Sequence, residues 1–400
     1  MHGDDVAQLN PAILIWARET AGLDVETAAR KISLNAARGV TGADRLAAFE
    51  AGDGSPSPAT LRKMAQQYHR PLLTFYMAEP PVAAELGQDF RTLPDQGDSS
   101  NVLLATLLRD VKARQALVRE ALEDDDYAEP VALVGAEWQT KDAATLSAAL
   151  VKAIGFDRAV FRARRSVDEA FGYLRGLIEA KGVFVLLAGD CGNHTTAIDV
   201  NTFRGFAIAD AMAPFIVVND QDAKSAWSFT LLHEMAHVLL GQGGVSGGAP
   251  QGAVERLCND TAAATLVTGA EINALTLSGS PADRRQIEAL ADRAKVSMTM
   301  IAYQLFRAER IEHDEWILYR DQFRSDWLAS KARQKEINRG SDGGPNWYIV
   351  RRHRLGAALL AVARQGMADG SLTPTRAARM LGVKPMNVYP LLAEPRRALA

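Results

Sequence analysis

Leu231-Leu232-His233-Glu234-Met235-Ala236-His237-Val238-Leu239-Leu240-Gly241 places the pattern His-Glu-x-x-His inside an apolar run. On a helix, His233 and His237 are one turn apart and point to the same side. Two imidazoles on one helix face supply half of a zinc site, and a carboxylate beside them can act as a general base. The stretch therefore predicts a metal helix in which His233 and His237 bind Zn²⁺ and Glu234 is the catalytic base.

Short apolar runs before the metal helix have the composition of β-strands. They are rich in β-branched or aromatic residues, are bounded by Gly, Asp, Asn or Pro, and cover residues 183–187, 206–209 and 215–218. The metal helix is expected to begin near Asp220 or Asp222 as N-cap and to end at Leu240. A glycine-rich loop over 241–252 follows, and then a second helix over 254–264, whose small residues allow close packing against the metal helix.

A catalytic zinc needs a third protein ligand. Glu255 comes one loop after His237, on a helix that can pack antiparallel to the metal helix, and is the predicted third ligand. Asn259 lies one turn further on the same face and could orient that carboxylate from behind. Asp260 and Glu271 remain alternative ligands. Glu255 could also be a solvated acid that complements the helix dipole.

This pattern resembles the ImmA/IrrE family of zinc metallopeptidases. The resemblance is carried by His233-Glu234-x-x-His237, by Glu255-x-x-Cys258-Asn259-x-x-Ala262-Ala263, and by the later segment 296–305. The chain departs from the family pattern at Cys258, where Ala is usual, at Val267-Thr268, and at Gln304, where Arg is common. The resemblance covers roughly residues 150–310. It implies a minimal zincin-like α+β domain in a cytoplasmic regulator that cleaves or holds a repressor or a toxin partner.

Length and composition narrow the class of protein. A chain of 400 residues predicts two or three domains. Its net charge of −3 gives no indication of a polyanionic partner such as nucleic acid. Two cysteines imply no disulfide framework and fit a reducing cytosol. The N-terminus is acidic where a signal peptide would be basic, and no apolar run approaches the ~18 residues of a membrane span. We expect a cytoplasmic protein without membrane contact, and the sequence predicts no oligomeric state.

Residues 1–80 read as a bundle of short helices that resembles the Cro/repressor-type helix-turn-helix domain. Asp24, Thr41 and Ser57 are the expected helix N-caps. Phosphate contacts need Lys or Arg, but this region holds eight bases against nine acids. In the expected recognition helix, 42–50, only Arg45 suits base readout. DNA binding and protein docking remain equally open for this domain.

The C-terminal segment has a different charge balance. After a helical connector (81–149), the peptidase domain (150–310) and a helical extension with hinge (311–345), residues 346–400 hold nine bases and two acids, a balance of +7. The sequence pattern over residues 375–384 predicts a helix, a turn at a glycine and a second helix. Arg376, Arg379 and Lys384 are the candidate DNA contacts. The alternative is a basic helical tail that docks on the protein's own acidic surface.

The sequence thus predicts a mainly α protein with a small β-sheet: an N-terminal helix-turn-helix bundle, a zincin-like peptidase domain and a basic helical tail. The expected function is a zinc-dependent endopeptidase of a regulatory type, with a partner protein as substrate. The alternative is a non-proteolytic DNA-binding regulator or antitoxin that uses the peptidase-like domain as a sensor or docking surface. No oxyanion donor can be identified, although His194 and Tyr303 are the nearest guesses.

Overall fold

The computed structural model describes residues 9–37, 39–80, 99–124, 128–192, 196–246, 252–277, 281–339 and 346–393. The chain forms two compact units, Met1–Arg109 and Asp110–Ala400, and helix α5 (Ser99–Glu123) contains the division. The prediction of a mainly α protein with a small sheet is confirmed. Among the residues described, none of the helices is both long enough and apolar enough to cross a membrane.

The first unit is built from short helices whose starts are set by local capping. Its elements are α1 (Pro11–Glu19), α2 (Val25–Lys31), α3 (Gly42–Ala51), α4 (Pro58–Gln67) and the 3-10 helix η1 (Leu72–Tyr76). Asp24, Thr41 and Ser57 each accept a hydrogen bond from the backbone of the helix they precede, as predicted. Inside the unit, Arg18 donates to both carboxylate oxygens of the buried Glu50, at 2.7 and 3.0 Å. This buried ion pair joins α1 to α3 inside the unit.

The second unit is organised around a four-stranded sheet. Its strands are β1 (Phe184–Leu187), β2 (Gly205–Ile208), β3 (Phe215–Val218) and β4 (Gly244–Ser246), in the order β1-β3-β2-β4. β1 runs parallel to β3, whereas β2 is antiparallel to both β3 and β4. The first three strands lie within one residue of their predicted positions. β4 falls in the stretch predicted as a glycine-rich loop, because its backbone pairs with β2 without any strand-like side-chain pattern.

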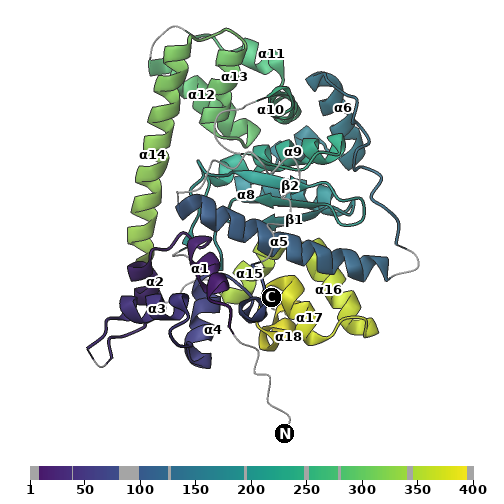
Figure 1. Ribbon diagram of the computed structural model, residues 1–400. Coiled ribbons are helices and arrows are strands. Elements are labelled where there is room, and N and C mark those ends of the chain that lie inside the picture. Colours follow the sequence, from purple (N-terminus) through teal and green to yellow (C-terminus); the bar gives the residue numbers. More distant parts are fainter. Residues whose placement is uncertain are drawn as a thin grey trace. The chain divides into compact units, whose positions relative to one another are not determined.

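One face of the sheet is covered by α8 (Val167–Glu179) and α9 (Lys224–Leu240), which pack together in the main core (Figure 1). Helix α9 is the predicted metal helix, and nearly all of its residues from Ala226 onward are buried. Its N-cap is Ala223, so the expected cap at Asp220 or Asp222 is wrong. The reason is that the Asp220 carboxylate pairs with Arg354 instead, at 2.6 Å. Asp222 accepts from the backbone N–H of Ala223.

Further helices surround this core. They are α6 (Ala143–Ile154), α7 (Arg158–Arg162), α10 (Ala253–Leu266), α11 (Gly269–Asn273), α12 (Pro281–Ala294), α13 (Met298–Arg307) and α14 (His313–Arg339). Residues before α6, within the predicted connector, close the end of α9: Gly135 N–H donates to Val238 O at 3.0 Å and Glu137 N–H donates to Leu239 O at 2.8 Å. These bonds satisfy carbonyls that a helix end leaves open.

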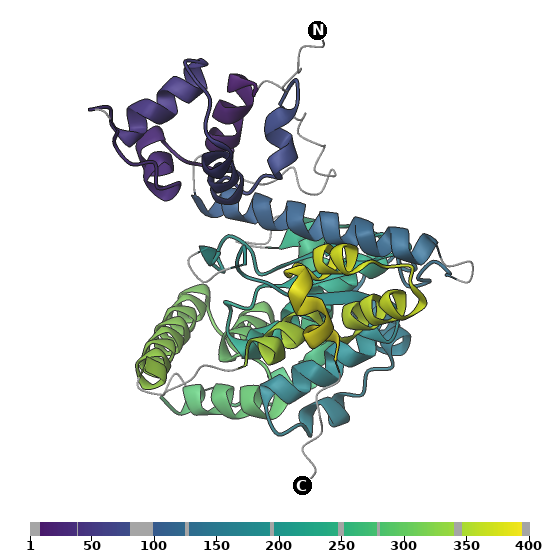
Figure 2. The ribbon, with the colours of Figure 1, turned by 90° about the horizontal axis from the view of Figure 1, so that it is seen from below.

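The C-terminal segment folds into a group of short helices on the β1 side of the sheet (Figures 1 and 2). They are α15 (Trp347–Leu355), α16 (Ala357–Asp369), α17 (Pro374–Leu381), the 3-10 helix η4 (Pro385–Asn387) and α18 (Val388–Leu392). The buried Arg175 of α8 donates to the backbone oxygens of Val185 in β1 and His353 in α15. Glu179 accepts from the N–H of Ala357 at 3.0 Å, so the segment is fastened at the sheet edge.

Candidate metal centre

Helices α9 and α10 bring three potential metal ligands together. His233 and His237 lie one turn apart on α9, and Glu255 lies in the first turn of α10, which packs against α9. Their ligand atoms all lie within 4.8 Å of one another. Both imidazoles are more than nine-tenths buried, whereas Glu255 is partly exposed. The structure thus assembles the three residues that the sequence predicted as ligands.

The spacing of the donor atoms suits a small divalent cation. The Nε2 atoms of the two histidines are 3.2 Å apart. Glu255 places one oxygen 3.3 Å from His233 Nε2 and the other 3.2 Å from His237 Nε2. Tetrahedral zinc with bonds of about 2.0–2.1 Å holds its ligands about 3.3 Å apart. Three nearly equal separations of this size, from two imidazoles and a carboxylate, fit zinc.

Glu255 and His237 also shift each other's protonation. Burial alone would raise the pKa of Glu255, but hydrogen bonds from His233 and His237 lower it to about 2. Burial likewise opposes protonation of His237, yet hydrogen bonds with Cys258 and Glu255 raise its pKa well above the ordinary value. The carboxylate is therefore ionised across the physiological range, whereas His237 would have to lose its proton before its ring could bind a metal.

Glu234 lies on the sheet side of α9. Its side chain is fully buried (0% exposed) and meets the backbone of β2 at Gly205. A carboxylate next to two imidazoles can accept a proton from one reactant and return it to another. No local pattern in the sequence identifies this neighbour, because Gly205 stands just before the predicted strand 206–209 and a strand glycine marks a bulge or bend as often as a close approach.

The alternative ligands are engaged elsewhere. Glu271 binds Arg162 through both oxygens, at 2.7 and 3.0 Å, and Asp260 pairs with Arg307 at 3.0 Å. Asn259 makes no side-chain hydrogen bond to another described residue, so its predicted role behind Glu255 stays a prediction. Tyr303 packs against Trp316, with ring centroids 5.3 Å apart. His194 lies outside the described residues.

The predicted DNA contacts are spread over both units. In the first unit, Arg45 donates to the backbone oxygen of Asn35 at 2.7 Å. In the second, Arg376 pairs with Glu120 at 2.6 Å, while Arg379 and Lys384 are exposed. Other arginines of the C-terminal helices donate to backbone oxygens of the same segment; they are Arg351, Arg352 and Arg364.

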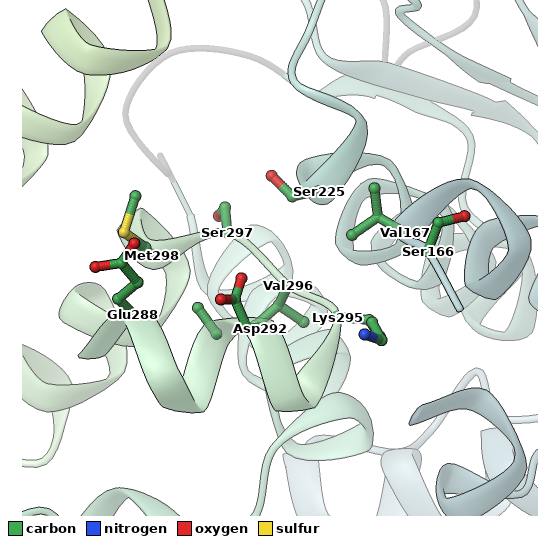
Figure 3. A pocket seen from close by; sticks show the side chains of 10 residues that line it. Ser166, Val167, Ser225, Glu288, Asp292, Lys295, Val296, Ser297 and Met298 are labelled. Carbon is green, nitrogen blue, oxygen red and sulfur yellow. The ribbon is translucent and has the colours of Figure 1, made fainter. Parts of the chain in front are cut away.

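A separate cavity of about 440 Å³ lies where α8, α9 and α13 begin (Figure 3). Its lining includes Ser225 and Lys295 together with the carboxylates of Glu288 and Asp292. Helix starts and a lysine favour anions, whereas the two carboxylates oppose them. This mixture selects no ligand, and none of the predicted site residues lines the cavity.

Comparison with known proteins supports the peptidase resemblance over part of the chain. Residues 190–306 match the family model of the M78 peptidases, described as the IrrE N-terminal-like domain. No curated protein and no solved structure matches the chain. The matched range contains β2, β3 and all three potential ligands, and it indicates a metallopeptidase-like function of the ImmA/IrrE type.

Proposed function

We propose that this chain is a zinc-dependent endopeptidase whose metal is held by His233, His237 and Glu255. The observation that carries the proposal is the near-equal separation of the three donor groups, 3.2 to 3.3 Å. Zinc held by these residues would supply Lewis acidity and a water that is nucleophilic near neutral pH. The match of residues 190–306 to a peptidase family supports the same reading.

In this proposal Glu234 moves the proton. Its carboxylate accepts a proton from the attacking water and delivers it to the amine that leaves when the peptide bond breaks. Full burial of the side chain strengthens this role, because electrostatic interactions are stronger where water is excluded. Glu255 holds a fixed negative charge that balances the cation, and the buried rings of His233 and His237 have little freedom to turn away.

We propose a partner protein as the substrate, presented as an extended segment. The edge strand β4 follows α9 directly in the chain and pairs with β2 on one side. A peptide can add to such an edge through backbone hydrogen bonds. A repressor or a toxin partner, as the ImmA/IrrE resemblance implies, would be recognised in this way, with the first unit as a DNA-binding or docking module.

Glu234→Gln tests the function. Glutamine keeps the size of the side chain but cannot accept the proton, so the variant should bind zinc at the unsubstituted stoichiometry. Cleavage of a partner protein or of an unfolded test protein should fall about 10²-fold or more. The matched control is Glu271→Gln, since that carboxylate binds Arg162. Cleavage by Glu234→Gln at the unsubstituted rate would exclude Glu234 as the base.

A further inference from the structure

Gly205, the first residue of β2, lies directly against the side chain of Glu234. A Cβ atom added to Gly205 would lie 2.7 Å from Glu234 Oε1 and 2.7 Å from Thr230 Cγ2. Thr230 and Glu234 are one turn apart, so both contacts lie on the same face of α9. Real Cβ atoms almost never approach other heavy atoms this closely. Any residue other than glycine would therefore displace something at this point.

The strand has little room to withdraw from α9. Gly205 is paired with Val218 of β3 on one side and with Ser246 of β4 on the other. The residue after Val218 is the fully buried Asn219, whose amide donates to Ile198 O at 3.2 Å and to Phe203 O at 3.0 Å. These bonds fasten the segment that leads into β2.

Helix α9 is held just as firmly. It is buried over most of its length, and its C-terminal carbonyls accept hydrogen bonds from the backbone of Gly135 and Glu137. With the strand and the helix both held, the side chains of Thr230 and Glu234 must yield, and the Glu234 carboxylate moves more easily because it is the far end of a flexible side chain. Its terminal atoms turn about side-chain bonds, whereas a shift of β2 would break ladder hydrogen bonds.

We propose that Gly205 is a positioning residue for Glu234. Its missing side chain leaves the space that the Glu234 carboxylate occupies between β2 and α9, and a methyl group at this position moves the carboxylate away. This inference rests on the proposed function, in which Glu234 carries the proton. A misplacement of about 1 Å in a reacting group can lower the rate by about 10²-fold.

Gly205→Ala is the first test. We expect zinc stoichiometry to be retained, kcat to fall about 10²-fold, and KM to change little, because the substitution moves the base and no ligand. Gly172→Ala is the matched control: a Cβ there would meet nothing within 4 Å, and this glycine lies on the exposed side of α8. Its kcat should equal that of the unsubstituted protein. A Gly205→Ala protein with unchanged kcat would overturn the proposal.

A stability cycle tests the contact without any use of activity. Gly205→Ala, Glu234→Ala and the double variant are compared by thermal unfolding. If the added methyl group acts on Glu234, Gly205→Ala should lower Tm less in the Glu234→Ala protein than in the unsubstituted protein. The comparison remains informative when Gly205→Ala alone is strongly destabilised. An equal loss in both backgrounds would overturn the proposal. If the unsubstituted protein bound no zinc or cleaved nothing, the proposed function would fail, while the cycle would still decide whether Gly205 sets the place of Glu234.

Discussion

The guanidinium of Arg354 lies 2.6 Å from the carboxylate of Asp220, and this ion pair joins the C-terminal helices to the turn that precedes α9. Arg354 also lies 3.0 Å from Asp190, in the segment that follows β1. One arginine therefore ties two loops at the same end of the sheet. Arg354 of the basic helical tail (346–400) is thus paired with carboxylates of the second unit. This matches the alternative in which the tail docks on the protein's own acidic residues.

We expect Arg354→Ala to destabilise the second unit by about 2–3 kcal/mol, since it leaves two nearly buried carboxylates without their cation. The value is set below that of a fully buried pair because the Arg354 side chain is 26% exposed. Urea unfolding measures the change. The control is Arg379→Ala, an exposed residue of the same segment, which should stay within about 0.5 kcal/mol. Equal changes in unfolding free energy for the two variants would show that the ion pairs of Arg354 do not stabilise the second unit.

Of the five possible zinc ligands, we expect zinc binding to depend on His233, His237 and Glu255, and not on Asp260 or Glu271. We expect His233→Ala or His237→Ala to weaken zinc affinity by more than about 100-fold, because even groups behind a ligand are worth 10- to 100-fold. Glu255→Gln should also weaken it, since a neutral amide balances no charge. Asp260→Asn and Glu271→Gln are the controls, because those carboxylates bind arginines. Competition with a chelator of known affinity measures all five, and a zinc loss in either control would reopen the choice of third ligand.

Glu271 should make stability depend on pH in acid. Its hydrogen bonds with Arg162, and then with Thr268, lower its pKa from 4.5 to about 2. Because the folded-state pKa is the lower one, the stabilisation is fully present above pH 4.5 and is lost as the pH falls toward 2. Glu271→Gln should remove this part of the slope, seen as a smaller loss of Tm between pH 4.5 and 2. A slope as steep as that of the unsubstituted protein would contradict the assignment.

Few basic side chains of the C-terminal helices are available to contact nucleic-acid phosphates. Arg379 and Lys384 are exposed, whereas Arg376 pairs with Glu120. We expect Arg379→Ala/Lys384→Ala to lower the slope of log affinity against log salt by at most about 1.8, that is, about 0.9 for each phosphate contact. An unchanged slope would leave both residues as solvated surface charges. In the first unit, Arg45→Ala should reduce discrimination between specific and random DNA if that unit reads sequence.

Local patterns allowed much of the fold to be predicted. The histidine pair follows from helix periodicity, since residues four apart share a face whatever surrounds them. The helix starts at Asp24, Thr41 and Ser57 follow from caps that act within one turn. The expected cap at Asp220 or Asp222 is wrong: the Asp220 carboxylate pairs with Arg354, far away in sequence, and Asp222 accepts from Ala223 N–H just before the helix begins.

By itself the sequence determined which residue types could bind a metal and carry a proton, and which of them share a helix, because both depend on short-range spacing. Only the tertiary structure decided that Glu255, and neither Asp260 nor Glu271, lies beside the two histidines, since this depends on how α10 packs against α9. It also decided that Gly205 meets Glu234, because strand and helix contacts join residues that no local pattern relates. In the same way, the charge of the tail was visible in the sequence, but its partners were chosen by the packing of α15 against the sheet edge.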